Sequence, residues 1–251
     1  MPESETPRAK PDRPALSAGW LSLTRTAARA ISSLMRPGHR PGEASPSDLP
    51  RVVSPDTLRP DRVPRGQVRT SKWPVLHAGP TPRVDLATWD LRVSGAVEAE
   101  KSWTWDEFRA LPAAVVAADM HCVTRWSRLD NAWEGVLVRE VMAHVAPGAG
   151  ARFVLIHAEN GFTANLPIED FLGEDCLFAW AHDGRPLDPD HGGPLRLVVP
   201  RLYAWKSAKW VRGVEFLERD EPGFWEQNGY HNHGDPWKLN SKGTDSAERF
   251  W

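Results

Sequence analysis

From residue 67 onward, short apolar runs alternate with polar and turn-forming residues, and this pattern predicts short strands with occasional helices. Residues 90–98 (DLRVSGAVE) predict a strand followed by a turn. Residues 194–200 (PLRLVVP) predict a buried strand, and residues 210–218 (WVRGVEFLE) predict another. The strands do not alternate regularly with long helices, so the pattern favours an α+β fold with a mixed sheet over a βαβ fold.

A hairpin is predicted in residues 151–167, where two apolar-rich runs flank Asn160 and Gly161. Asn-Gly is the dipeptide most typical of a two-residue turn between antiparallel strands, because both residues tolerate positive φ.

Three short helices are expected. Thr104 and Glu107 form a capping-box pattern ahead of the first. Residues 136–146 have helical spacing and stop at Pro147-Gly148, and residues 168–172 predict a single helical turn.

Composition changes near residue 66. Residues 1–66 hold 11 of the 23 prolines and are rich in arginine and serine, so we expect a leader that is largely irregular or disordered. Leu21 to Met35 could form a short amphipathic helix, and a targeting segment is the alternative. Residues 67–251 are expected to be one domain, with an irregular C-terminal extension from about residue 219.

Net charge, apolar runs and the content of cysteine and tryptophan limit the possible classes of function. The formal net charge of -2 gives no reason to expect nucleic acid as a partner. No apolar run approaches the ~20 residues of a membrane-spanning helix. Two cysteines make no disulfide framework and fit a reducing compartment, so we expect a cytoplasmic protein. The 13 tryptophans indicate tight packing around something partly polar.

The most informative short stretch is DMHCVTRWS, residues 119–127, which surrounds Cys122 with polar residues. Cys122 could simply fill the core, or it could be a reactive or metal-bound thiolate, because a nearby arginine or histidine stabilises the charged sulfur. These two interpretations are equally supported by the local residues. A cysteine hydrolase is a further alternative, although His121 is adjacent in sequence and its side chain should diverge. Cys176 lies in an apolar stretch, which predicts a core residue.

A second cluster, residues 191–210 (HGGPLRLVVPRLYAWKSAKW), combines glycines with several cations. Backbone N–H groups near glycines, together with arginine and lysine, suit an anionic phosphate ligand. A strand with a solvated basic flank is the simpler interpretation of the same residues.

Taken in order, WPVLHAG, DMHCVTRWS, NGFTANLPIED and HGGPLRLVVPxxYAWKSAKWV resemble the molybdopterin-binding oxidoreductases of the sulfite oxidase family. The resemblance runs from Trp73 to Trp237 and is strongest to small bacterial members that lack a fused haem domain. The family's dimerisation domain is expected to be missing as well. The resemblance implies one molybdenum–molybdopterin cofactor per chain, with Cys122 as the protein's ligand to the metal.

The resemblance also assigns cofactor contacts to His191, Arg196, Ser207, Ala208 and Lys209, and to Leu76 and His77 in the preceding loop. Arg125, Tyr203, Lys206 and Lys209 are candidates for binding an anionic substrate or stabilising oxyanion charge. The family's sulfite-oxidising members carry further arginines around the metal, and only Arg125 offers a loose match.

The implied activity is two-electron oxygen-atom transfer on a small, sulfur-containing substrate. A reductase of sulfoxides or N-oxides is the alternative within this cofactor class, and a non-catalytic binding protein that keeps the fold is the alternative outside it. The sequence has no haem motif or ferredoxin-type cysteine set, so electrons are expected to pass to or from an external partner protein.

Overall fold

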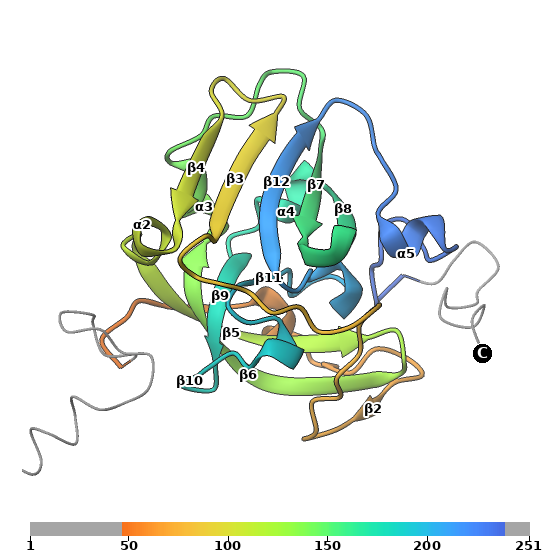
Figure 1. Cartoon of the computed structure of the whole chain (residues 1–251). Coiled ribbons are helices and arrows are strands. Elements are labelled where there is room, and N and C mark those ends of the chain that lie inside the picture. The colour runs from red at the N-terminus through yellow and green to blue at the C-terminus, as the bar shows by residue number, and fades with distance from the viewer. Residues whose placement is uncertain (1–46, 239–251) are drawn as a thin grey trace, which may run out of the picture. The chain divides into compact units, whose positions relative to one another are not determined.

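The computed structural model describes residues 47–238, which contain two β-sheets and four short α-helices (Figure 1). The helix predicted at residues 21–35 lies outside the described residues. This arrangement confirms the predicted α+β fold with mixed sheets.

The first sheet is built on a long antiparallel hairpin, β5 (Ala113–Cys122) and β6 (Trp126–Leu137). Its order is β1-β5-β6-β9-β10, with β11 paired to β9 and β2 paired to β6. The remaining strands of this sheet are β1 (Arg51–Val53), β2 (Val68–Arg69), β9 (Leu177–His182), β10 (Arg185–Pro186) and β11 (Arg196–Val198).

The second sheet has the order β4-β3-β12-β7-β8. Its strands are β3 (Asp90–Gly95), β4 (Lys101–Thr104), β7 (Phe153–Ala158), β8 (Thr163–Pro167) and β12 (Val211–Leu217). The central strand β12 is parallel to β3 and antiparallel to β7, so the sheet is mixed. The predicted hairpin is confirmed as β7–β8, with positive φ at Asn160 (61°) and Gly161 (73°).

The helices are short and lie at strand ends: α2 (Trp105–Arg109), α3 (Val138–Met142), α4 (Ile168–Phe171) and α5 (Phe224–Gln227). The capping box at Thr104 and Glu107 is confirmed. The second predicted helix begins at Val138, because residues 136 and 137 complete strand β6. Among the described residues, no helix has the length and apolarity needed to cross a membrane.

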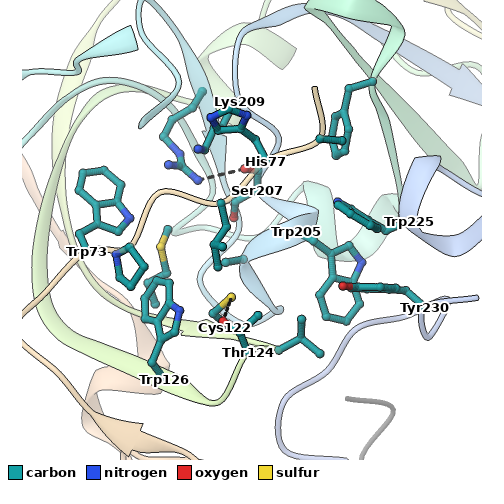
Figure 2. Close-up of a pocket in the computed structure, with 18 of the residues that line it drawn as sticks. Trp73, His77, Cys122, Thr124, Trp126, Trp205, Ser207, Lys209, Trp225 and Tyr230 are labelled. Atoms are coloured by element: carbon teal, nitrogen blue, oxygen red, sulfur yellow. Dashed lines mark hydrogen bonds between the residues drawn. The ribbon is translucent and has the colours of Figure 1, made fainter. Parts of the chain in front are cut away.

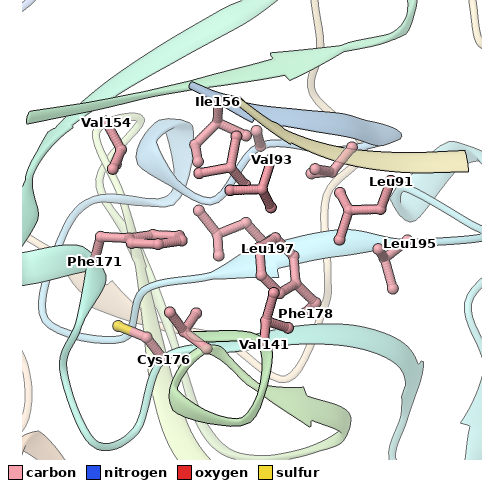
Figure 3. Packing of buried hydrophobic residues seen from close by; sticks show 14 of the residues in the cluster. Leu91, Val93, Val141, Val154, Ile156, Phe171, Cys176, Phe178, Leu195 and Leu197 are labelled. Atoms are coloured by element: carbon pink, nitrogen blue, oxygen red, sulfur yellow. The ribbon is translucent and has the colours of Figure 1, made fainter. Parts of the chain in front are cut away.

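The main core lies between the two sheets and is filled by fully buried side chains such as Val93, Ile156, Phe178 and Leu197 (Figure 3). Burying a side chain of this size stabilises the fold by roughly 1.5–3 kcal/mol. Cys176 has no exposed surface and belongs to this cluster, as its apolar neighbours predicted.

The fold begins earlier than the composition change at residue 66 predicts. Strand β1 pairs in parallel with β5, and the buried Ser54 that follows it donates to Asp175 at 2.5 Å. Arg62 binds both carboxylate oxygens of Asp119, at 2.6 and 2.8 Å. The amino-acid composition does not reveal this segment, because residues 51–62 are joined to the rest of the fold mainly by backbone pairing and by polar and charged contacts.

Strand β5 was also missed, since the polar residues around Cys122 hide any alternation. The structure buries them: Asp119 is paired with Arg62, and His121 Nδ1 lies 2.9 Å from Ser127 Oγ. A strand can carry polar residues on a buried face when each finds a partner, and such a strand has no simple apolar pattern.

Candidate functional site

The site is a cavity of about 270 Å³ at the end of the β5–β6 hairpin, bounded by loops from distant parts of the chain (Figure 2). Its walls include Trp73, Leu76 and His77 from one loop, and Arg196, Ser207 and Lys209 from the β11 region. Further lining residues are Pro74, Ala78, Met120, Cys122, Val123, Thr124, Trp126, Phe162, Ala204, Trp205, Trp210, Trp225 and Tyr230. Residues predicted from two separate motifs therefore meet in one place.

Cys122 is the last residue of β5 and supplies the cavity with a free thiol, 8% exposed. Thr124 Oγ1 donates a hydrogen bond to its sulfur at 3.1 Å. Burial raises the pKa of the thiol, while the Thr124 bond and the charge of Lys209 oppose that rise. The sulfur needs a cation or a metal beside it to ionise fully.

His121 faces away from the cavity, as expected for neighbouring residues on a strand. Its Nδ1 pairs with Ser127, its ring packs edge-on against Trp237, and its buried Nε2 has no partner among the described residues. Burial lowers the pKa of this imidazole to about 4. A hydrolase in which His121 is the base for Cys122 is therefore excluded by geometry.

A buried cation, Arg196, and a half-buried one, Lys209, line another part of the cavity. Arg196 is 2% exposed and donates to the carbonyls of His191 (2.9 Å) and Ser207 (3.0 Å), while its buried Nε has no partner among the described residues. Lys209 Nζ donates to the Asp190 carbonyl at 2.5 Å. Burial lowers the pKa of Arg196 to about 10, and burial together with Arg196 lowers the pKa of Lys209 to about 7.

Gly192 holds these two cations close to the backbone. Its φ of 106° lies in the left-handed region, and a Cβ there would come within 3.1 Å of Arg196 Cβ and of Lys209 Cβ. A side chain at this position would crowd the first side-chain atoms of both residues, so the glycine of the HGG motif has a specific packing role.

A third side of the cavity is aromatic. Figure 2 shows Trp205, Trp225 and Tyr230 on the opposite side of Cys122 from Trp73 and Trp126. Tyr230 packs edge-on against Trp205, with ring centroids 5.1 Å apart. The sequence signal for these walls was the high tryptophan content, which did not show which of the rings would converge.

His191 supports the cavity from behind. Its ring stacks on Trp73 with centroids 3.8 Å apart, its Nε2 lies 3.1 Å from the Trp73 carbonyl, and its Nδ1 is held by Asp188. His191 is absent from the cavity wall, so the structure gives it a supporting role through Trp73.

Four other predicted residues also lie outside the cavity wall. Arg125 is exposed on the turn after Cys122, with a φ of 68°. Tyr203 is buried and stacks on Trp205, and Ala208 is buried behind Ser207. Lys206 is fully buried and forms an ion pair with Glu226 at 2.6 Å. The prediction that Arg125, Tyr203 and Lys206 face an anionic substrate does not agree with these positions, because their side chains are either solvated or used inside the fold.

The donor set fits a metal-bearing group with an anionic tail. A soft thiolate suits a transition metal. Arg196 is buried and Lys209 is half-buried beside it, and neither forms an ion pair within 4 Å with a described carboxylate, which is costly unless an anion joins them. The unpartnered Nε of Arg196 is the local sign of that anion.

Comparison with known protein families identifies the group that this donor set suits. The family model of the oxidoreductase molybdopterin binding domain matches residues 78–225. The chain is a molybdopterin-binding oxidoreductase. The matched region contains Cys122, Arg196, Ser207 and Lys209, so this oxidoreductase brings to one cavity a thiol and cations that suit molybdopterin.

Relatives support the assignment. The uncharacterized oxidoreductase YuiH of Bacillus subtilis is 48% identical over 178 residues, which are 70% of this oxidoreductase and 90% of YuiH. The protein-methionine-sulfoxide reductase catalytic subunit MsrP of Xanthomonas campestris is 26% identical, over 65% of this chain and 57% of MsrP. Sulfite oxidase of Arabidopsis thaliana is 27% identical, over 61% of this chain and 48% of that enzyme. This oxidoreductase therefore spans about half the length of the last two relatives.

Among solved structures, the sulfane dehydrogenase SoxCD of Paracoccus pantotrophus has the same fold, with a TM-score of 0.51 and 18% identity over 55% of this oxidoreductase and 40% of that chain.

Proposed function

We propose that this oxidoreductase catalyses two-electron oxygen-atom transfer on a small, sulfur-containing substrate. The observation that carries the proposal is the position of Cys122, whose thiol opens into a cavity that is also lined by the buried Arg196 and the half-buried Lys209. Membership of the molybdopterin-binding family supplies the cofactor class.

Cys122 would hold the metal through Sγ, and the Thr124 hydroxyl, 3.1 Å away, would donate to that sulfur and tune its charge. Arg196, Lys209 and the backbone around Ser207 would hold the cofactor's phosphate. His77 lies between the Gly79 carbonyl (3.0 Å) and the edge of Trp210, which orients its ring at the cavity wall. When bound, the cofactor supplies the oxygen-atom transfer and the two-electron redox change.

Electrons need an external partner, which we propose to be a protein that carries one electron at a time. Reducing one sulfoxide to a thioether and water consumes two electrons and two protons, so two reduced carriers are oxidised in each turnover. Oxidation of a substrate would reverse that balance. Among residues 47–238 no His/Cys/Asp/Glu group is arranged to hold a second metal centre.

The decisive experiment compares Cys122→Ser with Cys176→Ser in protein loaded with cofactor. Cys122→Ser should abolish turnover and the sulfur-to-metal charge-transfer absorption, while circular dichroism stays unchanged. Cys176→Ser should change neither, because Cys176 is buried in the main core. Purified protein without molybdenum after expression in a cofactor-competent host would contradict the proposal.

Reduction of a sulfoxide or an N-oxide is the second candidate, and the aromatic walls favour it. Among the described residues that line the cavity, the basic side chains are Arg196, Lys209 and His77, whereas Trp205, Trp225 and Tyr230 offer apolar surface beside Cys122. An uncharged organic oxide suits such a surface better than an inorganic oxyanion does. Assays in both directions, with an artificial electron donor and an artificial acceptor, separate the two candidates.

We also propose a cytoplasmic location. Cys122 and Cys176 are both free thiols, which suits a reducing compartment. Cell fractionation with detection of the native protein tests this, and recovery outside the cytoplasm would overturn it.

A further inference from the structure

Residues 68–76 (VRTSKWPVL) form the edge of the cavity, and we call them the rim segment. Trp73, Pro74 and Leu76 line the cavity on one side of this segment. Val68 is 69% exposed and Val75 is 43% exposed in the same segment. The segment therefore contributes both to the cavity wall and to the solvent-exposed surface.

Exposed cations lie in and next to the rim segment. Arg69 and Lys72 are exposed within the rim segment, and Arg125 is exposed on the neighbouring turn, whose carbonyl accepts from Val68 N at 3.0 Å. Arg69 lies 3.6 Å from Asp130. Lys72 and Arg125 form no ion pair with any residue in the range 47–238. The whole chain has a formal charge of -2, so this cluster is a local departure from the overall balance.

Trp73 connects this surface to the interior. Its ring stacks on His191 (centroids 3.8 Å apart), lies 4.2 Å from the His182 ring, and forms part of the cavity wall beside Trp126 (Figure 2). A redox group held against the rim segment would face the cavity across a single layer of aromatic side chains.

We propose that Val68, Lys72, Val75 and Arg125, here called the rim surface, dock a one-electron carrier protein through an acidic face around its redox group. This inference rests on the proposed function, because only a redox enzyme without a second centre needs such a partner. Two reduced carriers would dock in succession for each sulfoxide converted to thioether and water, each giving up one electron.

The mixture of apolar and cationic residues in the rim surface favours an acidic electron-carrier protein as its partner. Small apolar contacts inside a ring of charge suit weak, rapidly exchanging electron-transfer complexes, which bury less than about 1,200 Å². Charges of one sign steer an oppositely charged partner and raise the association rate. An anionic membrane would also attract the cations, but the exposed apolar residues are two valines, which provide little surface for insertion into lipid.

The test uses the cofactor-loaded full chain, with reduced flavodoxin as an acidic carrier and a zwitterionic viologen as a small donor. Lys72→Glu combined with Arg125→Glu reverses the two unpaired cations. The matched control reverses Lys101 and Arg139, both exposed and remote from the cavity wall. We expect the rim variant to lower the second-order rate with flavodoxin about ten-fold at low ionic strength and to flatten its salt dependence. Its rate with the viologen should stay within two-fold of wild type, and the control pair should change neither rate.

An unchanged flavodoxin rate in the rim variant, or an equal loss in the control pair, would overturn the docking surface. Binding to vesicles of phosphatidylglycerol that disappears in the rim variant, with an unchanged flavodoxin rate, would assign the surface to a membrane instead. If loaded wild-type protein shows no turnover with the viologen donor and none with an artificial electron acceptor, the proposed function fails. In that case flavodoxin binding measured by surface plasmon resonance, in wild type and rim variant, still decides the docking proposal.

Discussion

Lys209 is half-buried beside Arg196, and this makes its charge depend on what binds. Burial and Arg196 lower the pKa of its amino group to about 7, against the opposing charges of Asp190 and Asp188, so the group gives up its proton as the pH rises through neutrality. An anion that binds beside Lys209 and Arg196 would restore the charged form. As a ligand for the cofactor Lys209 would be charged, whereas in the absence of an anion it titrates.

Replacing Lys209 by methionine should weaken cofactor retention by roughly 10- to 100-fold, since hydrogen bonds to charged groups contribute about 1.5–3 kcal/mol. Cofactor content of purified protein measures this directly. In wild type, affinity should fall as the pH rises through about 7, and Lys209→Met should lack that component. Equal retention in variant and wild type would remove Lys209 from the cofactor site.

Two buried histidines should make the free energy of unfolding fall as the solution becomes acidic. Burial lowers the pKa of both His121 and His182 to about 4, against an ordinary value of 6.5. Between these values the unfolded chain binds protons that the folded chain does not, so stability is full above pH 6.5 and falls as the pH decreases toward about 4. Each histidine contributes at most about 3 kcal/mol to this loss.

Denaturant unfolding at a series of pH values between 4 and 7 measures the slope. His121→Gln should flatten it, because this variant has no imidazole to protonate at that position. A variant with the wild-type slope would show that His121 stays charged when folded.

At the scale of elements, α5 is held to the body of the domain by a buried ion pair. Lys206 Nζ contacts the Asn165 carbonyl at 2.8 Å and Glu226 at 2.6 Å, and Glu226 also accepts from Trp205 Nε1 at 2.7 Å. Since Trp225 lies next to Glu226, this pair positions one aromatic wall of the cavity.

Lys206→Met alone should destabilise the fold by roughly 3–5 kcal/mol, because it leaves Glu226 buried without its cation. The double variant Lys206→Met with Glu226→Gln should recover a substantial part of that loss, since no charge remains unpaired. Equilibrium unfolding of the two variants checks both statements. Equal stability of the single and double variants would mean that the pair is not coupled.

Elements with strong local signals were predictable from the sequence. The Asn160-Gly161 turn and the Thr104 capping box depend on neighbouring residues, and both are confirmed. Strand β5 was not predictable, because Asp119 is buried against Arg62, which is distant in sequence, and His121 against Ser127 across the hairpin. The sequence motifs identified Cys122, Arg196 and Lys209, which all line one cavity. They did not predict that Lys206 pairs with Glu226 inside the fold or that Arg125 lies outside the cavity wall.

For the whole molecule, cofactor binding should be a large source of stability. A ligand that binds only the folded state stabilises it by about 2.7 kcal/mol at a concentration one hundred times its dissociation constant. Loaded protein should therefore unfold at a higher temperature than protein stripped of cofactor, as measured by calorimetry. Cys122→Ser should reduce the difference, and an identical transition with and without cofactor would contradict the assignment of the cavity.

The cavity walls come from positions as far apart as Trp73 and Tyr230, and this spread has a consequence for biosynthesis. Trp225 and Tyr230 follow the other cavity residues in the chain, so the cavity cannot be complete until residue 230 has been synthesised. A cofactor that needs the complete cavity cannot be enclosed before that point. The Lys206–Glu226 ion pair, which fixes α5 beside the cavity, also requires Glu226 to have been synthesised.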